Sequence, residues 1–115
     1  CRTHQVGVFN IRVFAAGVLV TDQRHGREIP ITSESDMDLE TKRAEAIHAV
    51  LDDDLGSKAQ RAIRFSLANP DISTVVFGAA EMGHMTDALG AADLGPLPED
   101  AMMRVRGVWD RNFGL

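Results

Sequence analysis

The sequence predicts an α/β fold in which two parallel strands are each followed by helices. Two short segments, residues 6–14 and 74–77, are apolar and rich in β-branched residues, which is typical of strands covered on both faces. Apolar residues recur at helical spacing after each of these segments. Because two such strands cannot cover their own edges, we expect neighbouring strands from elsewhere in this protein or from another chain.

Length and composition limit the architecture and the partners. A chain of 115 residues is at most one domain. Twelve basic residues face seventeen acidic ones, and the net charge of −5 argues against general nucleic-acid binding. No apolar run approaches the roughly 20 residues that span a membrane. The single cysteine, Cys1, excludes an internal disulfide framework and favours a reducing, cytoplasmic location.

The start of the sequence predicts that it is the later part of a longer protein. The sequence opens on Cys1 instead of Met, and the first strand-like run begins by residue six. Residues 21–37 then form a polar stretch that is long for a loop in a compact domain. Loops of this length are usually functional or partly disordered.

The first helix is predicted over residues 39–51. One stripe at helical spacing holds its apolar residues, which are Ala44, Ile47, Val50 and Leu51. Three consecutive aspartates, residues 52–54, end the helix, and Gly56 marks the turn that follows.

The second helix is predicted to open at Ser57 and to stop before Pro70. Ser57 and Gln60 have the spacing of a capping box. The predicted buried face consists of Ala59, Ala62, Ile63 and Leu67, and the residues expected to lie away from it are Lys58, Arg61 and Arg64.

Two further helices are predicted after the second strand. The first has a stripe of Met82, Met85, Ala88, Leu89 and Ala92. The second starts at Pro98 and is expected to bury Ala101, Met102, Val105, Val108 and Trp109. We expect the methionines at positions 82, 85, 102 and 103 to fill the core.

The turn after the second strand is the best candidate for chemistry. Gly78 follows the strand directly, and the small residues Ala79 and Ala80 precede Glu81 and the next helix. A strand that turns through glycine into a helix start offers backbone N–H groups and a positive dipole end to a phosphate. The alternative is an ordinary turn between a strand and a helix.

Two side chains near these strand ends have both a functional and a structural interpretation. Arg12 ends an apolar run, so it either holds a phosphate or pairs with a carboxylate. His84, one turn into the helix after Gly78, either touches a ligand or is solvated. The other histidines show no ligand spacing, the aspartate run lacks the pattern of a calcium loop, and no nucleophile–base pair is evident.

Three stretches resemble the C-terminal part of the aldo-keto reductases. They are residues 62–80, with the sequence AIRFSLANPDISTVVFGAA, residues 91–100, with AADLGPLPED, and residues 8–19, with VFNIRVFAAGVL. Their order and spacing match over nearly the whole chain.

The resemblance implies that residues 1–115 are the C-terminal part of a single (β/α)8 TIM-barrel domain. They would supply strands seven and eight with their helices, and the rest of the barrel would be required. The implied parent is an oxidoreductase that moves a hydride between a nicotinamide cofactor and a carbonyl or alcohol. The family's catalytic Asp, Tyr, Lys and His come from earlier strands, and this sequence contains no Tyr. The segment alone is therefore not expected to be an enzyme.

The resemblance also implies a cofactor site in the loops after these two strands. The implied cofactor-binding residues are Arg12, Val13, Phe14, Gly78, Ala79, Ala80, Glu81, His84 and Asp87. NADP(H) is the leading cofactor by resemblance. NAD(H) is the alternative, because Glu81 stands where Ser or Asn is common and would repel a ribose phosphate. Two other functions remain as alternatives. In the first, the chain is a non-catalytic α/β module that completes a barrel with a partner chain. In the second, it is a self-standing anion-binding domain.

Overall fold

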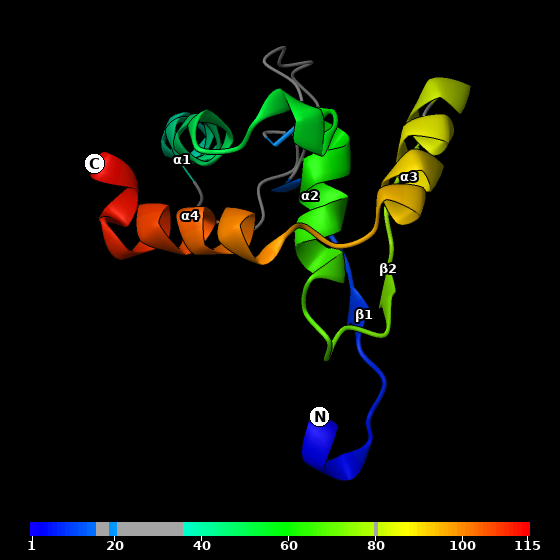
Figure 1. Ribbon diagram of the computed structural model, residues 1–115. Coiled ribbons are helices and arrows are strands. Elements are labelled where there is room, and N and C mark those ends of the chain that lie inside the picture. Colours follow the sequence, from blue (N-terminus) through cyan, green and yellow to red (C-terminus); the bar gives the residue numbers. More distant parts are fainter. Residues whose placement is uncertain (16–18, 21–35, 80) are drawn as a thin grey trace.

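The computed structural model describes residues 1–15, 19–20, 36–79 and 81–115. The described residues form two strands and four α-helices, in the order β1 (Phe9–Asn10), α1 (Met37–Ala49), α2 (Lys58–Leu67), β2 (Thr74–Val75), α3 (Met82–Leu94) and α4 (Glu99–Asp110). Figure 1 shows their arrangement. Short 3-10 turns cover Arg2–His4, Asp53–Leu55 and Asn112–Gly114. The predicted α/β class is confirmed by this arrangement, and most of the predicted polar stretch at residues 21–37 lies outside the described residues.

The two strands pair in parallel, as predicted. Phe9 is opposite Thr74 and Asn10 is opposite Val75. The backbone N–H of Val76 also donates to the carbonyl of Asn10 at 2.9 Å. The carboxyl ends of the two strands therefore lie beside each other, although their residues are more than 60 positions apart in the sequence.

The predicted length and burial of the first strand are wrong. Only Phe9 and Asn10 are in strand conformation, and the backbone turns at Arg12, where φ is 55°. Phe9 is 76% exposed and Ile11 is 61% exposed. Among the described residues each strand has one neighbouring strand, so Phe9 and Ile11 lack the cover that a larger parallel sheet would give them.

Two apolar clusters form the core. The first joins the segment after α1 to α4 and the link before it, through Leu51, Leu55, Leu97, Ala101 and Val105. The second lies between α2, α3 and the chain after β1, and it contains Val13, Ile63, Ala88 and Ala91. Figure 1 shows α2 and α3 side by side, and contacts between these two helices are the most extensive of any pair of described elements. This packing brings the N-terminal ends of α2 and α3 onto one side of the molecule.

Side chains define where the first two helices begin. Asp36 caps α1, because its Oδ1 accepts from the backbone N–H of Asp38 at 2.9 Å. The predicted capping box of α2 is confirmed: Ser57 Oγ accepts from the N–H of Gln60, and the Gln60 side chain accepts from the N–H of Ser57. Gly56, at φ 110°, makes the turn that separates the two helices.

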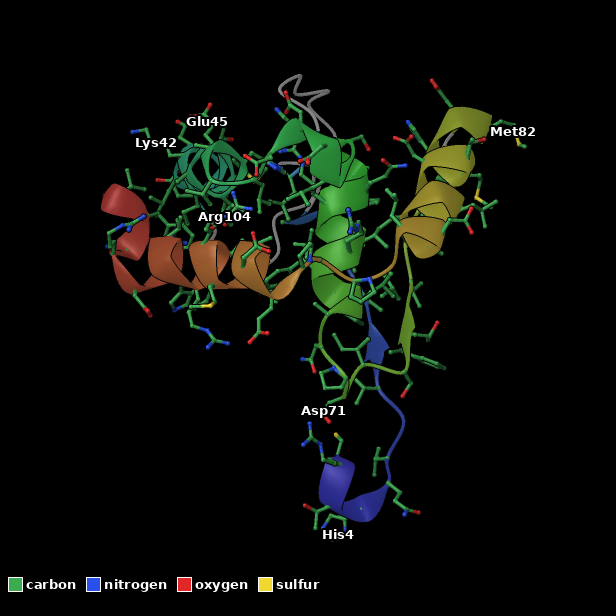
Figure 2. All side chains as sticks on the ribbon, viewed as in Figure 1. His4, Lys42, Glu45, Asp71, Met82 and Arg104 are labelled. Atoms are coloured by element: carbon green, nitrogen blue, oxygen red, sulfur yellow. The ribbon has the colours of Figure 1, made fainter. Side chains whose placement is uncertain are left out.

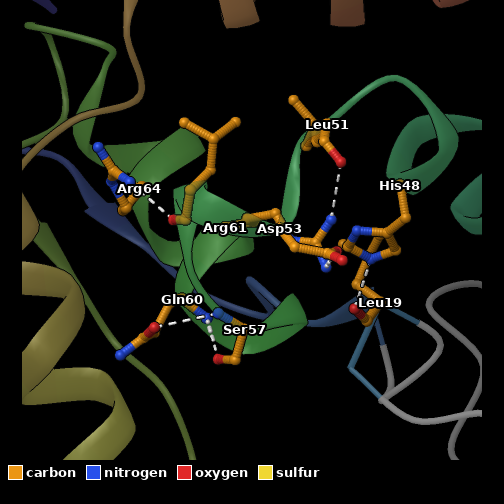
Figure 3. Close-up of polar contacts among 9 residues, drawn as sticks. Leu19, His48, Leu51, Asp53, Ser57, Gln60, Arg61 and Arg64 are labelled. Atoms are coloured by element: carbon orange, nitrogen blue, oxygen red, sulfur yellow. Dashed lines mark hydrogen bonds and ion pairs between the residues drawn. The ribbon is translucent and has the colours of Figure 1, made fainter.

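The predicted outward position of Arg61 and Arg64 is wrong, since each is only 7% exposed. Figure 3 shows the two guanidinium groups turned toward backbone carbonyls of neighbouring segments. Arg64 donates to the carbonyl oxygens of Leu55 at 2.7 Å, Gly95 at 2.8 Å and Pro96 at 3.2 Å. Arg61 donates to the Leu51 carbonyl at 3.2 Å. Because neighbours pack on several sides of α2, its polar stripe is covered as well as its apolar one.

Several apolar residues that were predicted to be buried are exposed. On α3, Met82 is 78% exposed and Leu89 is 65% exposed, and Figure 2 shows Met82 projecting outward at the far end of the helix. Trp109 on α4 is 71% exposed. Leu67, Met85, Ala92 and Met103 are exposed as well. The helix α3 instead meets α2 through the small residues Ala88 and Ala91, which permit a close approach.

A surface ion pair holds the N-terminal turn. The guanidinium of Arg2 lies 2.6 Å from the Asp71 carboxylate, which Figure 2 labels in the turn between α2 and β2. The hydrogen bond from Arg2 lowers the pKa of Asp71. The stabilisation from this pair is therefore present at neutral pH and is lost as the pH falls through the range in which Asp71 becomes protonated. Both groups are exposed to solvent, so the contribution is small.

Candidate site at the carboxyl ends of the strands

The first hollow of the candidate site lies directly beyond the two strands. It has a volume of about 510 Å³ and is lined by residues 11–14 and 76–78. The rings of Phe14 and Phe77 form part of its wall, with their centroids 6.4 Å apart. The parallel pairing of β1 and β2 builds this hollow, because it places the two post-strand segments next to each other.

A second hollow of about 500 Å³ lies between the N-terminal parts of α2 and α3. It is lined by Phe14, Val20, Ser57, Lys58, Ala59, Ile63, Gly78, His84 and Asp87. Phe14 and Gly78 line both hollows, so the two are adjacent and we treat them together as the candidate site.

Six of the nine sequence-predicted site residues line these hollows. Arg12 and Val13 line the first hollow, His84 and Asp87 line the second, and Phe14 and Gly78 line both. Ala79 and Glu81 are exposed next to Gly78 and line neither hollow. Ala80 lies outside the described residues.

Gly78 leaves open space at the junction of the hollows. A Cβ built on Gly78 meets no described heavy atom within 4 Å. A ligand can therefore approach the backbone here, and a side chain at this position would project into unfilled space. Helix α3 begins at Met82, and Glu81 at its N-cap makes no capping hydrogen bond through its side chain.

Arg12 lies at the rim of the first hollow in an unusual backbone conformation. Its φ of 55° is in the left-handed region, where residues other than glycine are uncommon. The N–H of Ala15 donates to the Arg12 carbonyl at 2.9 Å and closes a tight turn. This turn ends the strand and keeps Val13 and Phe14 against the core while Arg12 is exposed.

A polar network fixes α2 against α3 at the second hollow. The Ser57 hydroxyl donates to Asp87 Oδ2 at 3.1 Å. The Gln60 side-chain amide donates to the backbone carbonyl of Asp87 at 3.2 Å. Gly90 makes room for Gln60, since a Cβ at Gly90 would lie 2.7 Å from the Gln60 Nε2. Two hydrogen bonds from the start of α2 therefore position Asp87, one at its carboxylate and one at its backbone carbonyl.

Ser57 and Lys58 are the polar lining residues of this site that sequence reasoning missed. The sequence assigns Ser57 a role as a cap, which the structure confirms, but nothing in its spacing predicts the additional contact with Asp87. Lys58 stands at a helical position that the sequence predicts to face solvent. The packing of α2 against α3 brings both residues to the hollow.

Comparison with known proteins identifies the family. A sequence model described as the Aldo/keto reductase family matches residues 1–110. The chain belongs to this family. Aldo/keto reductases are oxidoreductases that generally depend on a nicotinamide cofactor, and their fold is a TIM barrel. The two parallel strands with their helices are consistent with an incomplete barrel of this family. A search of curated proteins finds no match to the chain.

The described residues contain neither a membrane helix nor a metal cluster. No described helix is long and apolar enough to cross a membrane. No group of three or more His, Cys, Asp or Glu residues comes together among the described positions in a way that could hold a metal ion.

Proposed function

We propose that this aldo/keto reductase segment supplies strands seven and eight of a barrel and binds the nicotinamide cofactor beyond their carboxyl ends. The observation that carries the proposal is the pair of adjacent hollows that share Phe14 and Gly78. In TIM barrels the loops after the last two strands frequently bind phosphate. The substrate class that accompanies this role is a carbonyl compound or an alcohol.

The lining residues suit different parts of a dinucleotide. The guanidinium of Arg12 at the rim provides charge-assisted hydrogen bonds to a phosphate. The open space at Gly78 admits a pyrophosphate close to the backbone. His84 and Asp87, at the other end, provide polar groups for an adenosine. The bound cofactor supplies the hydride chemistry, whereas these residues hold and orient it.

The same proposal accounts for the uncovered sheet. Phe9, Ile11 and Val76 are exposed, and among the described residues each strand pairs with a single neighbour. Further barrel strands would cover these side chains and supply the catalytic groups. A partner chain that completes the barrel around a non-catalytic module would cover them equally well, and this is the second candidate function.

A pair of glycine substitutions tests cofactor binding. Neither Gly78 nor Gly83 has a described heavy atom within 4 Å of a built Cβ, so a side chain can leave the backbone at either position without a close contact at its Cβ. Only Gly78 lines the hollows. In the protein expressed from its whole reading frame, we expect Gly78→Leu to weaken the binding of a reduced nicotinamide cofactor at least tenfold. We expect Gly83→Leu to leave it unchanged. Equal affinities of both variants and the unsubstituted protein, measured by cofactor fluorescence, would place the site elsewhere.

A further inference from the structure

A small cavity lies between α1, α2 and α4. Its volume is about 100 Å³, and Arg61 of α2 lines it. Its apolar wall includes Ile47, Leu51, Phe65 and Val105. Among the described lining residues, the cavity shares only Val13 with the first hollow and none with the second. It is therefore a feature separate from the candidate cofactor site.

The guanidinium of Arg61 is buried with few partners for its five N–H donors. Its Nη1 donates to the Leu51 carbonyl at 3.2 Å, a contact that Figure 3 shows. Its Nη2 lies 4.0 Å from the carboxylate of Asp53, which is beyond hydrogen-bond distance, and that carboxylate is fully exposed to solvent. Its Nε is buried and has no hydrogen-bond partner among the described residues. Arg64, in contrast, donates to three carbonyls.

No carboxylate compensates this charge at the cavity wall. Among the described lining residues, the polar side chains are those of Arg61 and His48. The Nε2 of His48 lies 2.7 Å from the Leu19 carbonyl, which can only accept, so this nitrogen donates. A buried cation with so few acceptors is costly. The cavity therefore combines an apolar wall with a cation that can donate further hydrogen bonds.

The geometry of the guanidinium indicates which kind of anion fits. In arginine, the Nε and Nη2 hydrogens lie on the same edge, and this edge makes two parallel hydrogen bonds to a carboxylate. At Arg61 this is the edge that has no hydrogen bond, because the Leu51 carbonyl is bound by Nη1. A phosphate would leave oxygens against the apolar wall, and a water molecule needs two to four polar partners.

The volume of the cavity limits the length of the ligand. An apolar cavity of roughly 150 Å³ takes up benzene, so about 100 Å³ suits an acid of about four carbons. The alkyl chain of such an acid would replace water at the wall formed by Ile47, Phe65 and Val105.

We propose that this cavity binds a short-chain monocarboxylate such as butyrate, with the carboxylate on the Nε and Nη2 edge of Arg61. The proposal does not depend on the proposed cofactor site. The ligand would contact three helices at once, so its binding would stabilise the packing of α1, α2 and α4.

The first test compares butyrate with butyramide, which has nearly the same shape and no charge. Dissociation constants are measured by titration calorimetry on the protein expressed from its whole reading frame. Butyrate should bind with a dissociation constant on the order of 1 mM or below, at least tenfold more tightly than butyramide. Absence of butyrate binding, or equal binding of the two compounds, would overturn the proposal. Absence of binding is also the result expected if a carboxylate side chain from elsewhere in the protein already pairs with Arg61.

The second test places the ligand at Arg61. Arg61→Met keeps most of the apolar stem and removes every donor, so it should weaken butyrate binding at least tenfold and abolish the preference over butyramide. Arg106→Met, at an exposed position of α4, is the matched control and should leave both constants unchanged. If Arg61→Met binds butyrate as tightly as the unsubstituted protein, the ligand binds elsewhere and the proposal is wrong. Arg61→Gln repeats the comparison should the methionine variant fail to fold.

Discussion

Arg64 connects three segments through backbone carbonyls. Its guanidinium reaches the carbonyl of Leu55 in the 3-10 turn and those of Gly95 and Pro96 in the link between α3 and α4. These carbonyls lie where helices end, so the cation supplies donors that the helical pattern itself does not. A buried residue of this kind stabilises the fold through hydrogen bonds and not through an ion pair.

We expect Arg64→Met to destabilise the protein by about 3 kcal/mol or more. The methionine keeps most of the apolar stem but removes every donor, and hydrogen bonds to charged groups contribute roughly 1.5–3 kcal/mol each. The check is the shift of the urea unfolding midpoint of the protein expressed from its whole reading frame. Arg106→Met, at an exposed position of α4, is the control and should change stability by no more than about 0.5 kcal/mol. A similar midpoint for both variants would show that the three carbonyls find other partners.

At the scale of elements, the contact between α2 and α3 determines the candidate site. Small residues of α3 meet α2, and the Gln60 side chain bridges the two helices above Gly90. Because Ser57 and Lys58 precede Gln60 on α2, any displacement of this bridge also moves two residues of the second hollow.

Substitutions at two glycines of α3 distinguish the effect of this helix contact on stability from the effect of helix propensity. Gly83→Ala should stabilise the protein by about 0.5–1 kcal/mol, because alanine is the better helix former and the position is open. Gly90→Ala should instead destabilise it by about 1–3 kcal/mol, because the new methyl overlaps the Gln60 amide. Thermal unfolding of both variants checks the opposite signs. Stabilisation by Gly90→Ala would mean that Gln60 moves aside at no cost.

At the scale of the whole molecule, the uncovered apolar surface is the main feature. The exposed side chains include Phe9 and Ile11 near the sheet, Leu89 on α3 and Trp109 on α4. Contiguous apolar surface and open strand edges mark places where other protein segments bind.

We expect the 115-residue chain, expressed alone, to aggregate, to be molten or to associate obligately, and to show no carbonyl reduction with either nicotinamide cofactor. Each described strand has only one neighbouring strand, and the catalytic groups that the family resemblance implies would come from other strands.

Light scattering and near-ultraviolet circular dichroism test whether the chain is aggregated, molten or associated. A cofactor oxidation assay tests whether it reduces a carbonyl. A monomer with one sharp unfolding transition would favour a self-standing domain, whereas turnover that persists through repeated purification would mean that the catalytic groups lie within these residues.

The local features of this protein can be predicted from its sequence alone. Capping at Ser57, the turn at Gly56 and the order of strands and helices depend on interactions between residues close in the chain, so their spacing is sufficient to predict them. The family resemblance placed Phe14, Gly78, His84 and Asp87 in one site, and the structure brings these four residues to the second hollow.

The covered faces and the further residues of the site could not be predicted from the sequence, because they depend on how the elements pack. The buried positions of Arg61 and Arg64 and the exposure of Met82 and Trp109 depend on packing between distant segments. So does the position of Lys58 at the wall of the second hollow. Helical periodicity indicates which side chains share a face, but not how many faces neighbours cover. A long guanidinium or ammonium side chain can also cross to a carbonyl or a hollow that belongs to another element. The sequence predicts a solvated face for the charged stripe of α2. For this reason the stripe instead supplies two buried hydrogen-bonded links to the segment between α1 and α2, and a lysine of the candidate site.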